Sequence, residues 1–191
     1  MSQFHRFAGA ALVVALLAST ELHAAEVAGV KIDERVRVGS SELVLNGAGL
    51  RSKLFIKLYV GALYVSQKSG TAAALIDATT PRRMGLRLLR DISADTLHSA
   101  LEEGLAHNNT PAELEAVKPQ SEQFGSLMRG LGKVHEGDSV ALDFSGDGVA
   151  LSINGEPRGK VAGGAFAKAL LKVWLGDKPA DAGLKKALLG N

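Results

Sequence analysis

The sequence predicts an α+β protein in which one antiparallel sheet is covered on one face by helices. Apolar and polar residues alternate through positions 27–67, which is typical of strands with one buried face. Apolar residues at helical spacing replace this alternation between 93 and 131, and alternation returns from 140 to 161. Runs of strands separated by runs of helices indicate an α+β order, because a parallel sheet needs strands and helices to alternate one by one.

The N-terminal half has the pattern of a β-meander. Val36 and Val38 alternate with polar residues, Leu43 and Leu45 repeat the spacing of two, and Asn46-Gly47 follows them. Because asparagine followed by glycine is a turn dipeptide, we expect a turn at this point. Residues 53–65 read KLFIKLYVGALYV, a run rich in strand-forming residues with few charges. This run predicts a strand that is buried on both faces.

The central region changes from strand to helix. Residues 71–76 favour a short helix, and residues 83–90 alternate as a further strand. Ser93 is placed to cap the helix that follows it. That helix carries one apolar stripe at helical spacing, formed by Leu97, Leu101 and Leu105. Pro111 predicts the start of the next helix, because proline is favoured in a first helical turn.

The C-terminal third returns to strands and ends in helices. Asp147-Gly148 separates two alternating runs and is the clearest hairpin signal in the chain. Asn154-Gly155 predicts a second turn, into a short strand near residues 159–161. The remaining apolar spacing predicts a helix over residues 165–175 and a short terminal helix around residues 184–188.

Composition places the chain among globular proteins with a sizeable core. It has 191 residues, of which 46% are hydrophobic and 22% are charged, and its net charge is +2. A length of this kind is typical of one domain. Disulfides, cysteine nucleophiles and cysteine-bound zinc are excluded because the chain has no cysteine. The lack of a basic stripe argues against nucleic acid as a partner.

The first residues have the layout of a secretory signal peptide. Arg6 precedes an apolar run over residues 7–18, and small residues follow at Ala24 and Ala25. We therefore expect residues 1–25 to be a leader that is cleaved after Ala24 or Ala25. The alternative is a membrane anchor, but the run is far shorter than the roughly 20 residues that span a bilayer. The mature domain would comprise residues 26–191 with no membrane span, and in a bacterium it would be periplasmic or secreted.

Familiar catalytic and cofactor motifs are absent from the sequence. It contains no HExxH, no GxSxG, no GxGxxG and no GxxxxGK followed by Ser or Thr. His98 lies beside an apolar stripe, and a solvated or hydrogen-bonded side chain explains it better than a metal ligand does. The sequence thus predicts no metal, no cofactor and no catalytic residue.

One cluster of residues suggests a ligand site. The segment NGAGLR, residues 46–51, places Arg51 after three small residues in a part of the chain expected to enter the sheet. An arginine is permanently charged, and its planar fork matches a carboxylate or a polarised carbonyl. Tyr59 and Tyr64 are the only tyrosines, and their odd spacing puts them on opposite faces of one strand. One of them could share an apolar slot with Arg51, whereas the alternative is an ordinary surface arginine and two packed aromatic residues.

Two runs resemble the bacterial chalcone-isomerase-like family. They are LVLNGAGLRSKLFIKLYVGALYV, residues 43–65, and ALLKVWLGDKPADAGLKKALL, residues 169–189. The resemblance extends from about Val30 to the C-terminus and includes the order of strands and helices. It implies a curved antiparallel sheet with helices packed on one face and a ligand cleft between them.

The resemblance also implies site residues. Arg51 matches the arginine that holds a ligand oxygen in plant chalcone isomerases and a carboxylate in plastid fatty-acid-binding proteins. Tyr59 falls where the isomerases have a threonine and the fatty-acid binders have a tyrosine. The tyrosine that the isomerases carry near the position of Ser93 is missing, and so is their asparagine within the stretch matching residues 97–101. Their hydroxyl residue before the last helices is replaced by Gly163-Gly164.

Three functions remain open from the sequence. The favoured one is non-catalytic binding of a small apolar acid such as a fatty acid, with Arg51 and Tyr59 as ligand-binding residues. The second is an isomerase or lyase acting on an unsaturated carbonyl compound, with Arg51 stabilising oxyanion charge. The third is an interaction module without a ligand, which would apply if Leu101, Phe124 and Trp174 filled the cleft.

Overall fold

A computed structural model describes residues 25–191 of the chain. The predicted leader lies outside this range except for Ala25, which begins strand β1 (Ala25–Val27). No helix within residues 25–191 is both long and apolar enough to cross a membrane.

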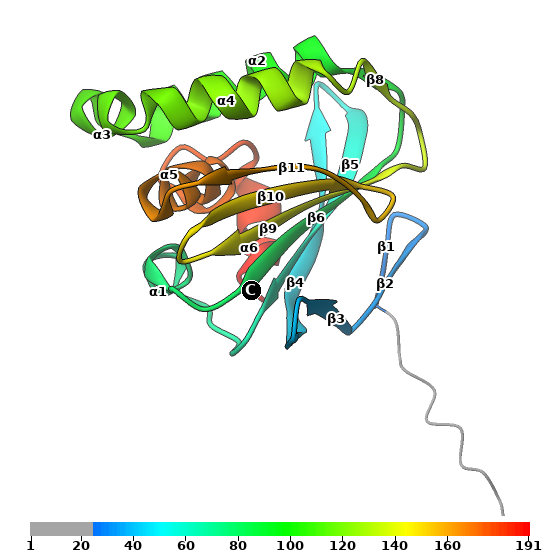
Figure 1. Ribbon diagram of the computed structural model, residues 1–191. Helices are drawn as coiled ribbons and strands as arrows, with labels where there is room; N and C mark the ends of the chain where they lie inside the picture. The colour runs from blue at the N-terminus through cyan, green and yellow to red at the C-terminus, as the bar shows by residue number, and fades with distance from the viewer. Residues whose placement is uncertain (1–24) are drawn as a thin grey trace, which may run out of the picture.

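The fold is built on one curved antiparallel sheet of seven strands, in the spatial order β11-β10-β9-β6-β5-β4-β3 (Figure 1). Strands β6 and β9 are neighbours in the sheet, although the chain between them contains the helices α2 (Ala94–Asn108), α3 (Pro111–Ala116) and α4 (Lys118–Arg129). The seven strands are β3 (Arg35–Val38), β4 (Ser41–Lys53), β5 (Ile56–Val65), β6 (Arg82–Leu88), β9 (Ser139–Ser145), β10 (Gly148–Ile153) and β11 (Glu156–Ala162). Two further pairs are small: β1 with β2 (Val30–Ile32), and β7 (Ile92–Ser93) with β8 (Lys133–Val134).

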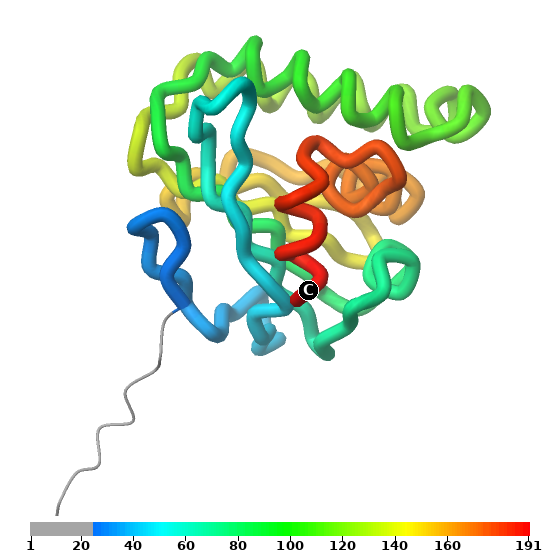
Figure 2. The backbone as a smooth tube through the Cα atoms, turned by 180° about the vertical axis from the view of Figure 1, so that it is seen from behind, coloured from blue at the N-terminus to red at the C-terminus, as the bar shows by residue number. Residues whose placement is uncertain are grey.

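Helices cover one face of this sheet, as the sequence predicts. Helices α2 and α4 run alongside each other as an outer layer, and α5 lies between that layer and strands β9 and β10 (Figure 1). Seen from behind, α6 lies against the β4–β5 hairpin (Figure 2). The helices are α1 (Ala72–Asp77), α2 (Ala94–Asn108), α3 (Pro111–Ala116), α4 (Lys118–Arg129), α5 (Gly164–Leu175) and α6 (Ala182–Leu188).

Capping and proline signals in the sequence correctly predicted where helices α2 and α3 begin. Ser93 caps α2, since its hydroxyl accepts a hydrogen bond from the backbone N–H of Thr96. Helix α3 begins at Pro111 behind a capping box formed by Thr110 and Glu113. Each of these arrangements satisfies backbone N–H groups that a helix start leaves without partners.

The sheet buries side chains on both faces. Met84, Leu86 and Leu88 of β6 belong to the large core under the helices. On the opposite face, Tyr64 belongs to a smaller core covered in part by the β1–β2 hairpin, whereas Tyr59 faces the helices. The two tyrosines therefore lie on opposite faces of β5, as their odd spacing predicts.

The expected turn at Asn46-Gly47 is wrong. Strand β4 continues through these residues, and the register shift between Leu45 and Gly47 makes Asn46 a bulge. The Asn46 amide nitrogen donates to the carbonyl oxygens of Ser69 at 3.0 Å and Leu188 at 2.7 Å. A turn dipeptide is thus used to fasten the end of α6 to the sheet, which no local preference could indicate.

The strand expected over residues 53–65 is also wrong at its start, because the chain turns at Leu54-Phe55. Both residues have positive φ, 49° and 67°, and Lys53 pairs with Ile56 across the turn. This is a two-residue turn of type I′. Bulky residues adopt such a conformation at a cost of roughly 1–2 kcal/mol each, so the pattern did not reveal the turn.

Candidate ligand-binding site

Strands β4 and β5 bring the two predicted site residues together. Arg51 and Tyr59 are direct partners in the antiparallel register, so their side chains share the face that the helices cover. Gly47 and Gly49 precede Arg51 on this face, and α6 packs over them. A Cβ on Gly47 would lie 2.0 Å from the carbonyl oxygen of Ala187. The small residues therefore make room for α6, and Arg51 is the next side chain of β4 on that face.

The Tyr59 hydroxyl connects three elements. It accepts hydrogen bonds from Trp174 Nε1 of α5 at 2.9 Å and from Arg51 Nη1 at 3.3 Å. The guanidinium carbon of Arg51 lies 5.4 Å from the centre of the Tyr59 ring, within range of a cation–π interaction. Because both contacts are donated to the phenol oxygen, the phenol proton remains available for a ligand.

Arg51 carries a positive charge that has no counter-ion among residues 25–191. It is partly buried, and no carboxylate of residues 25–191 forms an ion pair with it. Its Nε atom is buried and has no hydrogen-bond partner in the same part of the chain. Buried polar atoms usually have partners, and one without is a position to explain. The guanidinium can therefore receive the two oxygens of a carboxylate.

An apolar cavity of about 50 Å³ begins at Arg51 and Tyr59. The sheet, α5 and the α2–α4 layer enclose it. The remaining residues around it are Leu86, Leu88, Leu97, Ala100, Leu101, Phe124, Met128, Val140, Leu142, Val173 and Trp174. Leu101, Phe124 and Trp174 thus occupy much of the cleft without closing it. Since small-molecule pockets measure roughly 300–1,000 Å³, a long apolar chain can enter only if α2 and α4 move outward.

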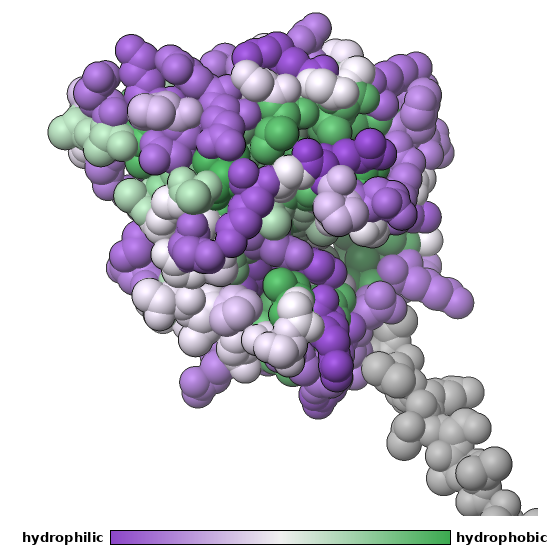
Figure 3. Space-filling model, in the orientation of Figure 1, coloured by the Kyte–Doolittle hydropathy of each residue, from purple (hydrophilic) through white to green (hydrophobic). Residues whose placement is uncertain are grey.

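A surface groove of about 200 Å³ adjoins this cavity. The two hollows share Arg51 and Ala100, and the groove is further lined by Lys53, Glu103 and Lys178. Arg51 therefore lies between an opening to solvent and an apolar interior. In Figure 3, hydrophobic side chains also reach the surface between α4 and β11, on a face that is otherwise mostly hydrophilic.

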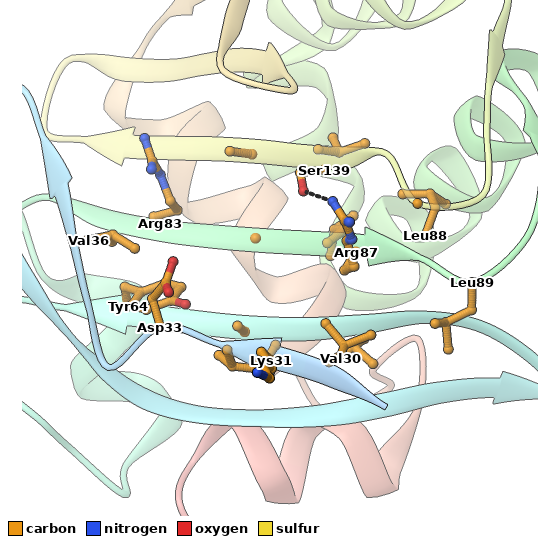
Figure 4. Close-up of a pocket in the computed structure, with 18 of the residues that line it drawn as sticks. Val30, Lys31, Asp33, Val36, Tyr64, Arg83, Arg87, Leu88, Leu89 and Ser139 are labelled. Atoms are coloured by element: carbon orange, nitrogen blue, oxygen red, sulfur yellow. Dashed lines mark hydrogen bonds between the residues drawn. The ribbon is translucent and has the colours of Figure 1, made fainter. Parts of the chain in front are cut away.

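A larger cleft of about 630 Å³ lies on the opposite face of the sheet, beneath the β1–β2 hairpin (Figure 4). Both of its arginines already have partners: Arg83 forms a two-bond ion pair with Asp143 at 2.5 and 2.7 Å, and Arg87 donates to Ser139 at 2.9 Å. Burial raises the pKa of Tyr64 in this cleft to about 12. We place the candidate site at Arg51, because the arginines of this cleft are bonded within the chain, whereas Arg51 has no ion pair among the described residues and adjoins an apolar cavity.

Sequence reasoning found two of the three polar groups at this site. It did not predict that Trp174 holds the Tyr59 hydroxyl, although a buried indole N–H generally requires an acceptor. Among residues 25–191, no group of three or more His, Asp or Glu side chains is arranged to hold a metal ion. The described site therefore contains one cation, one phenol and one indole beside apolar side chains.

Comparison with known proteins supports the same fold. The chain matches the model of the family described as chalcone isomerase-like over residues 24–190. It belongs to the chalcone isomerase-like family. No curated protein sequence matches it. Among solved structures, a fatty-acid binding protein of Arabidopsis thaliana is similar, with a TM-score of 0.65 and 17% identity over 84% of this chain and 92% of that one. The α+β fold with a curved antiparallel sheet is thus confirmed.

Proposed function

We propose that this chalcone isomerase-like protein binds a small apolar acid, such as a fatty acid, with its carboxylate on Arg51. The observation that carries the proposal is the partly buried guanidinium without a counter-ion, which adjoins an apolar cavity. The Tyr59 hydroxyl would donate to a carboxylate oxygen, and the tail would lie among the apolar side chains beneath α2.

The lining of the cavity supports a ligand with one polar end. Among the described residues that line it, Arg51, Tyr59 and Trp174 are the only ones with nitrogen or oxygen in their side chains, and they lie together. Each methylene buried among the others contributes about 0.8 kcal/mol. A long tail could therefore supply most of the affinity while Arg51 selects the acid. The similar plant structure is that of a fatty-acid binding protein, which agrees with this proposal.

The same lining supports binding more than catalysis. General acid–base catalysis requires a titratable group within hydrogen-bond reach of the reacting atoms. Among residues 25–191, no Asp, Glu, His or Lys lines the cavity, and Glu103, His107 and Lys178 line only the adjoining groove. Inside the cavity, an isomerase would have only Tyr59 and Arg51 to use. The leader predicted over residues 1–25 supports a place of action outside the cytoplasm, either in the periplasm or after secretion.

Isothermal titration of Arg51→Gln with palmitate and with methyl palmitate tests the proposal. Hydrogen bonds to charged groups contribute about 2 kcal/mol, so palmitate affinity should fall roughly 30-fold. Affinity for the uncharged ester should change little, because the ester offers no negative charge to Arg51.

Arg37→Gln is the matched control, because Arg37 is exposed on β3, away from the site. It should bind both ligands as the wild type does. Failure of the wild-type protein to bind palmitate, or equal losses for acid and ester in Arg51→Gln, would contradict the proposed role. Wild-type turnover of a chalcone that Arg51→Gln abolishes would favour the isomerase.

A further inference from the structure

The tip of the β4–β5 hairpin exposes three large apolar side chains in succession. Leu54 is 83% exposed, Phe55 is fully exposed and Ile56 is 46% exposed. No other large hydrophobic residue between 25 and 191 is exposed to this extent. Contiguous apolar groups on a surface commonly mark a contact with a protein or a membrane.

Turn formation alone does not explain these residues. Two other hairpins of the chain have the same type I′ turn, with φ of 50° and 83° at Ala28-Gly29 and of 51° and 83° at Asn154-Gly155. Both use glycine at the second position, where positive φ is easily adopted. The β4–β5 turn has two bulky apolar side chains instead, although Asn-Gly would form it more readily.

Two lysines flank the apolar tip. Lys53 and Lys57 are exposed, and neither forms an ion pair with any residue that the structure describes. Lys53 pairs with Ile56 in the register, and Lys57 pairs with Ser52, so the lysines lie on opposite faces of the ribbon. The hairpin therefore ends in an apolar point with a positive charge on either side.

We propose that this tip docks the protein on the surface of an anionic lipid bilayer. Leu54, Phe55 and Ile56 would enter the boundary between head groups and acyl chains, while Lys53 and Lys57 would meet lipid phosphates. An apolar insertion combined with nearby lysines is the pairing of forces that holds peripheral proteins on anionic membranes. Docking goes beyond the proposed ligand and does not depend on it.

The tip lies next to the groove that leads to the candidate ligand site. Both backbone views show the β4–β5 hairpin reaching the level of the α2–α4 layer (Figures 1 and 2). Lys53 also lines the groove that leads to Arg51, together with Lys178 and one acidic residue, Glu103. A docked tip would bring the open end of this groove to the bilayer, so that an apolar acid could pass between them without crossing water.

Co-sedimentation with lipid vesicles tests the proposal on the chain as it exists, without added ligand. Wild type should bind vesicles of phosphatidylcholine with phosphatidylglycerol more tightly than vesicles of phosphatidylcholine alone. The double variant Leu54→Asn, Phe55→Gly should lose about tenfold or more in partitioning, because Ile56 is then the only one of the three apolar side chains left to bury. Its melting temperature should stay the same or rise, because Asn-Gly suits the turn.

The variant Lys53→Gln, Lys57→Gln separates charge from apolar insertion. It should reduce binding to the anionic vesicles by about fivefold per lysine and leave binding to neutral vesicles unchanged. Added salt should weaken wild-type binding in the same direction. Lys31→Gln, Lys68→Gln is the matched control, since both lysines are exposed, unpaired within residues 25–191 and distant in sequence from the tip.

Three results would overturn docking. The first is a wild type that binds neither kind of vesicle, and the second is a Leu54→Asn, Phe55→Gly variant that binds as wild type does. The third is a wild-type dimer that dissociates in this variant, with no vesicle binding, which would identify the tip as a contact between two copies of the chain.

Discussion

Tyr59 joins the cation of β4 to the indole of α5 through one oxygen atom. Its side chain is 2% exposed, and Trp174, which donates to it, is 5% exposed. At the scale of single residues, the site therefore depends on a buried hydrogen bond between positions that are 115 residues apart in the chain. Removing its acceptor leaves a buried donor unsatisfied, which costs more than the net value of an ordinary hydrogen bond.

Tyr59→Phe should lower the free energy of unfolding by about 1–3 kcal/mol, measured by urea denaturation. Tyr64→Phe is the control on the opposite face of the same strand, because the Tyr64 hydroxyl makes no hydrogen bond to any described residue. It should change stability little. Equal losses in the two variants would mean that the hydrogen bonds of the Tyr59 hydroxyl are not the source of the cost.

At the scale of elements, α6 and the β4–β5 hairpin determine the position of the Arg51 side chain. Asp181 caps the start of α6, and its carboxylate accepts from the backbone N–H of Leu184 at 2.9 Å and of Ser52 at 3.3 Å. The glycines of β4 let the helix lie directly on the strand. The close approach thus positions α6 beside the site and leaves the face above Arg51 open for a ligand.

Gly47→Ala should test this packing. The added methyl group would meet the backbone oxygen of Ala187, which can yield only if α6 shifts. Overpacking of this kind typically costs about 1–3 kcal/mol, and thermal or urea unfolding would show it. Gly85→Ala on β6 is a matched strand glycine with ordinary space, 3.8 Å to its nearest neighbour, and should be nearly neutral. An equally neutral Gly47→Ala would show that α6 is loosely held.

At the scale of the whole molecule, the α2–α4 layer covers one side of the cavity. Helix α2 is held at its start by the Ala94 N–H, which donates to the Gly132 carbonyl at 2.8 Å. At its end, the Asn108 and Asn109 amides donate to the carbonyls of Lys178 at 2.7 Å and Ala169 at 3.2 Å. The middle of α2 lies over the cavity between these two attachments. We therefore expect ligand uptake to bend this layer outward about its ends.

Ala100→Phe should obstruct the passage, because Ala100 borders both the groove and the cavity. Palmitate affinity in isothermal titration should fall by about tenfold, since a bulky side chain in a packed space costs energy of this order. Ala106→Phe, at an exposed position of the same helix, should bind normally. Unchanged affinity in Ala100→Phe would mean that the ligand enters by another route.

The sequence by itself determined much of the local structure and indicated Arg51 and Tyr59 as candidate site residues. Alternation placed β6, β9 and β10, Ser93 and Pro111 marked helix starts, and Asn154-Gly155 marked a turn. The pairing of Arg51 with Tyr59 was also predictable, with help from the family resemblance. These features depend on residues near one another in the chain, whose preferences the sequence displays directly.

Only the tertiary structure decided the remaining features of the site. Asn46-Gly47 became part of a strand because α6 packs on it, and Leu54-Phe55 formed a turn because the flanking strands pair. The cavity volume and the Trp174 contact likewise depend on segments that meet only after folding. Local preferences are worth about 1 kcal/mol per residue, so burial and pairing between distant segments can override them.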